Sequence, residues 1–286
     1  MHFLRIFPIA VILVSSWPSL PAQVQPAAGA PLPDIRQLMK EVHEHQKQLD
    51  KVRENYTYSV SKMVQEIDTK GQVSKTETQE IEVFFVNGHE IWQVVKKEGK
   101  PLTDEEQKKE TGRVTKLVEK AEKTPPDQPL EGHVISISRV LEIMEVRNER
   151  RESYRGRAAI VFDFAGRKDA ETHGLAEDAS KKLQGTMWVD EADRQVAHLD
   201  VAFNDNFRVA GGVVATIQKG SNFHLDQAKV NGEIWLPTGT EGSMQARVLL
   251  VKGIRQHFTE RDYDYKRFHA EAQQGKDAKV VVENKP

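Results

Sequence analysis

The chain contains no cysteine among its 286 residues. It therefore forms no disulfide, and no cysteine is present to carry a lipid anchor or to act as a catalytic nucleophile. After residue 22 no apolar run approaches the roughly 20 residues that a membrane-spanning helix needs. These absences favour a chain that folds on its hydrophobic core alone, outside the membrane.

Motifs of the common catalytic and metal sites are also missing. No Gly-x-Ser-x-Gly elbow occurs, and Gly211-Gly212 lacks the rest of a phosphate-binding loop. His43 and His45 lie two residues apart, so on a helix their side chains point in different directions, and Lys47 stands where a zinc-protease motif needs histidine. We predict no catalytic residues, no metal site and no cofactor. An enzyme would need titratable groups that converge in one pocket, which sequence spacing does not test.

Positive and negative charges are nearly balanced. Lys and Arg total 41, Asp and Glu total 43, and the formal net charge is −2. Such a balance gives no reason to expect nucleic acid or an anionic surface as a partner.

The first 22 residues are typical of a secretory signal. His2 and Arg5 precede a mostly apolar stretch at residues 6–17, and Ala22 is a small residue of the kind found where signal peptidase cleaves. This stretch is too short to span a bilayer. We expect cleavage near Ala22 and a soluble, unlipidated protein in the periplasm.

Helical spacing is clearest just after a linker at residues 23–33, which is rich in Ala, Pro and Gln. Asp34 is a candidate N-cap, and the apolar residues that follow recur on one helix face. These residues are Ile35, Leu38, Met39, Val42, Leu49 and Val52. Thr103 and Glu106 form a capping box that predicts a second, charged helix as far as Lys123.

Alternating patterns predict strands in both halves of the chain. The first half contains three, at residues 56–60, 73–86 and 90–95, with Asn87-Gly88 as a hairpin turn. Between the halves we expect short helices at 138–146 and 175–183, a turn at 154–157 and a strand at 158–164. The second half predicts further extended segments at 187–190, 195–203, 207–218, 222–230, 233–237 and 244–260, and an edge strand or anchor at 263–268.

In two of these later strands a tryptophan follows shortly after a glycine, in Gly185-Thr186-Met187-Trp188 and in Gly232-Glu233-Ile234-Trp235. This pattern indicates successive hairpins of one curved sheet. The predicted fold class is therefore α+β: a strongly curved antiparallel β-sheet, or half-open barrel, with an N-terminal helix and additional helices on its concave side. We expect a single domain over residues 34–269 and a frayed tail at 270–286.

The succession of these elements, with Met187-Trp188-Val189-Asp190, Arg194 and Glu233-Ile234-Trp235-Leu236-Pro237, resembles the LolA-like superfamily. That superfamily comprises outer-membrane lipoprotein-sorting and related periplasmic proteins. The resemblance implies a half-open barrel whose lining holds acyl chains. The chain is longer than a minimal lipoprotein chaperone of this type, and the excess is an enlarged helical insertion around residues 97–183.

The resemblance implies a non-enzymatic periplasmic binding protein for a lipid, an acyl chain or a lipidated protein, with outer-membrane lipoprotein sorting as one role. A dry concavity is enough for this, because acyl burial contributes roughly 0.8 kcal/mol per methylene. The candidate apolar lining is Leu199, Val201, Phe203, Phe223 and Leu225, with Trp92, Trp188 and Trp235 at the rim.

A second hypothesis is an envelope sensor that binds another polypeptide, as a related branch of the superfamily does. Residues 147–157 are rich in arginine, interleaved with glutamate. The segment is expected to be a salt-bridged, solvated turn, or alternatively a docking site for an acidic partner that uses Arg150 and Arg151.

Overall fold

The fold is known from a computed structural model, which describes residues 31–126, 130, 137–230, 232–249, 252–269 and 281–283. The predicted signal sequence at 1–22, most of the linker and most of the C-terminal tail lie outside these residues. Within them, no helix combines the length and the apolar composition that crossing a membrane requires.

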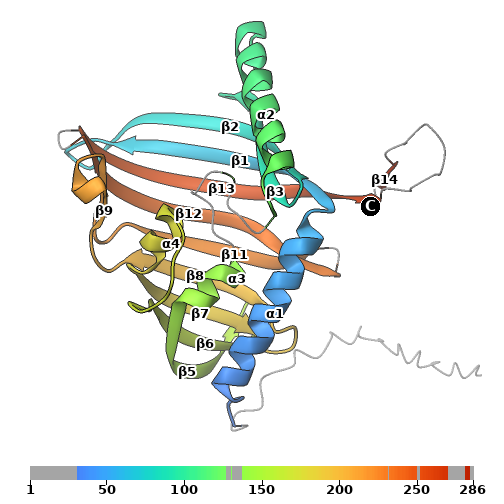
Figure 1. Cartoon of the computed structure of the whole chain (residues 1–286), viewed down its shortest axis with the longest axis vertical. Coiled ribbons are helices and arrows are strands. Elements are labelled where there is room, and N and C mark those ends of the chain that lie inside the picture. Colours follow the sequence, from blue (N-terminus) through green and yellow to red (C-terminus); the bar gives the residue numbers. More distant parts are fainter. Residues whose placement is uncertain are drawn as a thin grey trace, which may run out of the picture.

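A single sheet runs through the described chain and is open rather than closed on itself. Its main path is β4-β3-β2-β1-β13-β12-β11-β8-β7-β6-β5, and every pairing is antiparallel. The sheet is strongly curved and carries helices on one side (Figure 1). The fold class predicted from the sequence is confirmed.

The strands are β1 (Tyr56–Ile67), β2 (Val73–Val86), β3 (His89–Lys97), β4 (Lys100–Pro101), β5 (Met144–Tyr154), β6 (Arg157–Gly166), β7 (Leu183–Asp190), β8 (Val196–Phe203), β9 (Phe207–Val209), β10 (Ala215–Ile217), β11 (Asn222–Val230), β12 (Ile234–Val248), β13 (Lys252–His269) and β14 (Val281–Glu283). The helices are α1 (Ile35–Arg53), α2 (Asp104–Lys123), α3 (Ile137–Ile143) and α4 (Leu175–Ser180), with a 3-10 turn, η1, at Ala210–Gly212.

Helix α1 lies across the sheet and is the predicted amphipathic helix. The Asp34 side chain caps its first turn by accepting a hydrogen bond from the Gln37 amide at 2.8 Å. Leu38 and Val42 are 1% and 0% exposed, and they pack into a core formed with α3, β6, β7 and β8. Burying each such side chain stabilises the fold by roughly 1.5 to 3 kcal/mol.

Strand register divides the sheet into two faces. Residues directly opposite in antiparallel strands share a face, so Phe162, Met187, Leu199 and Leu225 form one row across β6, β7, β8 and β11. We call the side of this row, on which α1 packs, the inner face. The next residue on each strand points to the opposite side, which we call the outer face.

Two glycines in strands let backbone and rings approach closely on the inner face. A side chain at Gly185 would place its Cβ 1.8 Å from the Asp200 carbonyl oxygen, and one at Gly242 would meet the Phe223 and Phe258 side chains at 2.8 Å. Glycine at such positions allows a sheet to bend and neighbouring aromatic rings to cover the gap. These residues therefore account for part of the curvature.

Helix α2 lies against strand β3 near one end of the sheet and extends beyond the strands (Figure 1). Its predicted capping box between Thr103 and Glu106 is confirmed. The Glu110 carboxylate accepts a hydrogen bond from the Val94 amide at 2.7 Å, and Arg113 donates to the Trp92 carbonyl. Glu110 and Arg113 thus form hydrogen bonds with backbone groups of β3 that would otherwise be free to pair with a further strand.

Two predictions for the middle of the chain were wrong in part. The helix expected at 138–146 ends at Ile143, and the basic segment expected as a solvated turn forms most of β5. β5 is the last strand of the sheet and pairs only with β6. Its arginine and glutamate residues leave no apolar face, so the sequence pattern did not reveal a strand here. The region 97–183 holds α2, α3 and α4 but also β5 and β6, so it is helical only in part.

Boundaries in the second half also differ from those predicted. The segment 207–218 is broken by η1, where Gly211 and Gly212 have positive φ, and the predicted strand 244–260 is divided by a turn at Leu249. Residues 263–268 are not a separate strand: they continue β13 beyond its pairing with β12, which ends at Arg261, and they pair with β1 and, from Arg267, with β14. The strand breaks at η1 and Leu249 were not predicted because the alternation of apolar and polar residues continues across these turns.

Candidate functional site

An apolar strip on the inner face is only half-buried. Phe223 lies opposite Gly242 in the register, Gly242 opposite Phe258, and Phe258 opposite Val64, so their row crosses β11, β12, β13 and β1. Phe223, Leu225, Phe258 and Val64 are all of intermediate exposure. We call these four residues the inner strip.

The predicted lining residues are brought together but are not equally accessible. Leu199 and Val201 are 5% and 6% exposed and belong to the closed core beneath α1, whereas Phe203, Phe223 and Leu225 pack at its margin and are partly exposed. Contact with Leu199 or Val201 therefore requires the helices packed on this core to move. The remaining three are accessible without such movement.

Charged residues lie beside the inner strip on the same face. Lys62 and Glu260 are opposite each other in β1 and β13 and form an ion pair at 2.7 Å. Lys62 Nζ also lies 5.4 Å from the centre of the Trp92 ring, a distance typical of a cation–π contact. Trp92 therefore lies beside charged residues of the inner face, and its role as a rim residue stays a prediction.

Asp262 is the most perturbed carboxyl group of this cluster. Burial raises its pKa to about 7, and the negative charges of Glu260 and Glu90 add to the shift, while Arg53 acts in the opposite direction. A carboxyl group in this state carries a proton near neutral pH and can donate a hydrogen bond. Sequence patterns gave no sign of it, because its burial depends on neighbouring strands.

The other two tryptophans lie on the outer face, away from the predicted lining. Trp188 stands between the inner-facing Met187 and Val189, and its ring centre is 5.0 Å from that of His198. Trp235 is 7% exposed and donates a hydrogen bond from Nε1 to Asp193 at 2.9 Å. The three tryptophans therefore do not form one rim.

Arg150 and Arg151 do not form a common patch either. In the β5 register Arg150 lies opposite Val161 and Arg151 opposite Ile160, so they point to opposite faces. Arg150 lies 3.4 Å from Asp163, and Arg151 forms an ion pair with Glu191 at 2.7 Å. Docking through these arginines stays a prediction, and would require both to exchange partners.

A polar network on the outer face was not identified from the sequence. His198 lies 2.8 Å from Asp226 and 3.1 Å from Asp200, and His224 lies 3.1 Å from the same Asp200 oxygen. Tyr154 donates a hydrogen bond to Asp226 at 2.6 Å. The histidines and aspartates converge here because β8 and β11 are neighbours, and Tyr154 joins them from the end of β5.

Two hollows accompany these features. One, of about 540 Å³, lies at the start of α1 and is lined by Ile35, Arg36, Met39, Leu141, Met144, Glu145, Val146 and Arg167. The other, of about 130 Å³, lies on the outer face. Across the described parts of the chain, no three His, Asp or Glu side chains are placed to hold a metal ion.

The matches of this chain with known proteins are to solved structures, at low sequence identity. No family model and no curated protein matches the chain. Among solved structures, a LolA superfamily protein, NE2245 from Nitrosomonas europaea, is 12% identical, with a TM-score of 0.34 over 82% of this chain and 93% of that one. A putative outer membrane lipoprotein-sorting protein domain from Vibrio parahaemolyticus is 10% identical, with a TM-score of 0.36 over 82% and 95%. MucB in complex with MucA(peri) is 9% identical, with a TM-score of 0.24 over 80% and 94%.

Proposed function

We propose that the chain is a non-enzymatic periplasmic binding protein that shelters a lipid, an acyl chain or the lipid of a lipidated protein on the inner face. The observation that supports this most directly is the inner strip. Phe223, Phe258 and Val64 lie in one row that crosses four strands, and Leu225 lies two residues along β11 from Phe223. All four side chains remain partly exposed, beside a closed core. A row of this kind suits an extended hydrocarbon chain.

The size of the strip is consistent with useful affinity. Neighbouring strands are roughly 4.8 Å apart, so a row from β11 to β1 extends about 14 Å. Transferring ten methylenes from water would contribute roughly 8 kcal/mol before the cost of ordering the ligand. No catalytic group is needed for such binding.

Helix α1 acts in this proposal as a cover over the more deeply buried part of the inner face. Gln46 donates a hydrogen bond to Gln195 at 2.6 Å, which ties α1 to the turn between β7 and β8. Displacing α1 would uncover part of the core that holds Leu199 and Val201, next to the inner strip. A long acyl chain would then gain further apolar contact.

The first test is native mass spectrometry of the protein purified from periplasm, together with displacement of a fluorescent fatty acid. Co-purified lipid, or a displaceable probe at micromolar concentration, is the expected result. If neither is observed, the proposal is wrong.

The second test uses a matched pair of variants on β13. Phe258→Gln puts an amide into the inner strip. His257→Gln also introduces glutamine, but at the preceding residue, which faces outward. We expect Phe258→Gln to weaken probe binding about tenfold or more, since it removes apolar contact along the row, and His257→Gln to leave binding unchanged. Equal effects would contradict the assignment of the inner face.

A further inference from the structure

Two loops at one end of the sheet lie side by side and expose aliphatic side chains. One contains η1 and links β9 to β10, and the other follows β12 (Figure 1). The Leu249 amide donates a hydrogen bond to the Val214 carbonyl at 3.1 Å, which holds the two loops together. Val213, Val214 and Leu249 are 57%, 48% and 66% exposed. We call these three residues the apolar tip.

The fold does not account for an aliphatic residue at Leu249. Its φ is +49°, in the left-handed region that glycine and asparagine adopt with less strain. Turns commonly carry Gly, Asn, Asp or Ser. Leu249 therefore combines a strained backbone with an exposed apolar side chain. Exposed apolar groups that gather in one place commonly mark an interaction site.

Positive charge without negative charge borders the apolar tip. Residues 207–218 and 244–256 include Arg208, Arg247, Lys252 and Arg255 but neither Asp nor Glu, and all four cations are exposed. Arg247 and Arg208 both lie opposite Thr216 in the register, so they share the outer face. The near balance of charge over the whole chain therefore does not hold at this end of the sheet.

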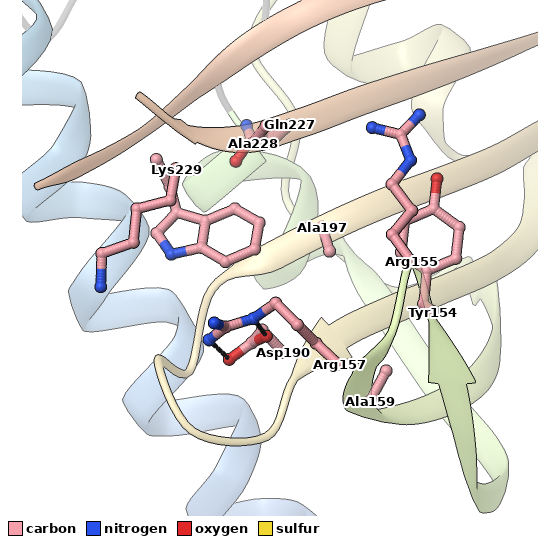
Figure 2. A pocket seen from close by; sticks show the side chains of 10 residues that line it. Tyr154, Arg155, Arg157, Ala159, Asp190, Ala197, Gln227, Ala228 and Lys229 are labelled. Atoms are coloured by element: carbon pink, nitrogen blue, oxygen red, sulfur yellow. Dashed lines mark hydrogen bonds and ion pairs between the residues drawn. The ribbon is translucent and has the colours of Figure 1, made fainter. Parts of the chain in front are cut away.

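Cations elsewhere on the outer face are paired within the protein. Figure 2 shows Arg157 against Asp190, beside the smaller hollow, where the two form a hydrogen bond at 2.9 Å. Near the apolar tip, Asp205 precedes β9 and pairs instead with Lys182 at 3.0 Å. Within the described chain, no ion pair joins the four cations around the apolar tip to a carboxylate. These cations can therefore contact an external anion without exchanging partners.

We propose that the apolar tip inserts into the surface of an anionic lipid bilayer while the four cations contact lipid phosphates. A negatively charged membrane surface attracts lysine and arginine side chains. Arg247 lies two residues before Leu249, roughly 7 Å of strand, and apolar groups at a membrane interface are buried by about 5 to 10 Å. Loops at the end of a sheet suit a lipid surface, whereas a polypeptide partner would need a matching hollow.

This inference goes beyond ligand binding on the inner face and does not rest on it. The apolar tip lies at the end of β12, whereas the inner strip crosses β12 at Gly242. The two sites can therefore be tested separately.

The first test is flotation of the protein, purified from periplasm, with protein-free vesicles. The vesicles contain phosphatidylcholine alone, or equal parts of phosphatidylcholine and phosphatidylglycerol. We expect binding to the mixed vesicles to be at least about tenfold tighter than to phosphatidylcholine, and to weaken at roughly 0.5 M NaCl because salt screens the attraction. No flotation with the mixed vesicles, or equal flotation with both kinds, would overturn the inference.

Matched variants separate apolar insertion from charge attraction. Asparagine tolerates the left-handed backbone, so Leu249→Asn should fold normally and weaken binding to the mixed vesicles about tenfold. Leu175→Asn, at an exposed leucine of α4, should leave binding unchanged. Arg247→Gln should weaken binding about fivefold, whereas Arg261→Gln, also exposed on the outer face but remote from the tip, should not. Equal effects within either pair would contradict the proposal.

Displacement of the fluorescent fatty acid serves as the control for the inner face. Leu249→Asn should leave this displacement unchanged while it weakens vesicle binding. If it weakens both to the same degree, vesicles bind through the inner face and the proposal is wrong.

A fluorescent label then reports insertion directly. Because the chain contains no cysteine, a single introduced one carries the label. Val213→Cys, labelled with an environment-sensitive fluorophore, should emit at shorter wavelength on the mixed vesicles and be quenched by lipids with a nitroxide on the acyl chain. Leu175→Cys with the same label should show neither change. If the protein floats while the label at residue 213 stays in water, the apolar tip does not insert.

Discussion

Replacing Asp262 by asparagine should stabilise the protein in a pH-dependent way. The pKa of this carboxyl group is raised from 3.8 to about 7, mainly by burial on the inner face. Val60, its partner in the register, is fully buried. Between pH 4 and pH 7 the folded protein therefore holds a proton that the unfolded chain has released.

The sign of the effect follows from this difference in bound protons. Because the folded state binds more protons, its stability falls as the pH rises from about 4 to about 7, and no further loss from Asp262 occurs above that range. A shift of about three pKa units corresponds to on the order of 4 kcal/mol. Some of this penalty is screened by solvent at a partly exposed side chain, so a loss on the order of 2 to 4 kcal/mol is expected.

Urea unfolding at pH 4.5, 6 and 8 measures the effect. Asp262→Asn should be nearly as stable as the unmodified protein at pH 4.5 and more stable at pH 8 by on the order of 2 to 4 kcal/mol. Asp264→Asn, at an exposed position two residues further along β13, is the matched control. The reasoning fails if the difference between Asp262→Asn and the unmodified protein is the same at pH 4.5 and pH 8.

Three further substitutions test the fold. Gly185→Ala should lower the free energy of unfolding by about 3 kcal/mol or more, because the new methyl group would overlap the Asp200 carbonyl; urea unfolding measures it, and near-normal stability would show that the close approach is wrong. Gly112→Ala has open space around it in α2 and should stabilise the protein by roughly 0.5 to 1 kcal/mol, so a loss in the same assay would contradict the exposed position. Thr103→Ala removes the capping box and should destabilise α2 by about 1 kcal/mol. Amide hydrogen exchange in the first turn of α2 should then be faster, and unchanged exchange would show that the cap does not matter.

Elements with strong local signals were predicted well. Asp34 and the apolar spacing after it gave α1, and Asn87-Gly88 gave the turn between β2 and β3, because caps and tight turns depend on a few neighbouring residues. β5 was missed because an arginine-rich edge strand has no apolar alternation. Strand breaks at Leu249 and η1 were missed because alternation continues through them.

The candidate sites were less predictable, because they depend on which strands are neighbours. Alternation placed Leu199 and Val201 on the same face as Phe223 and Leu225, but it did not show that the first two are buried in the core. Phe258 was not identified, since its place beside Phe223 follows from the register of β12.

An open sheet has two exposed margins along which a second copy of the chain could add a strand. At one margin, Glu110 and Arg113 of α2 occupy backbone groups of β3. At the other, β5 is interrupted by a bulge near Asn148, whose φ is +58°, and carries charged side chains along its length. Both devices discourage edge-to-edge association, so the curved sheet can stay open without becoming a template for aggregation.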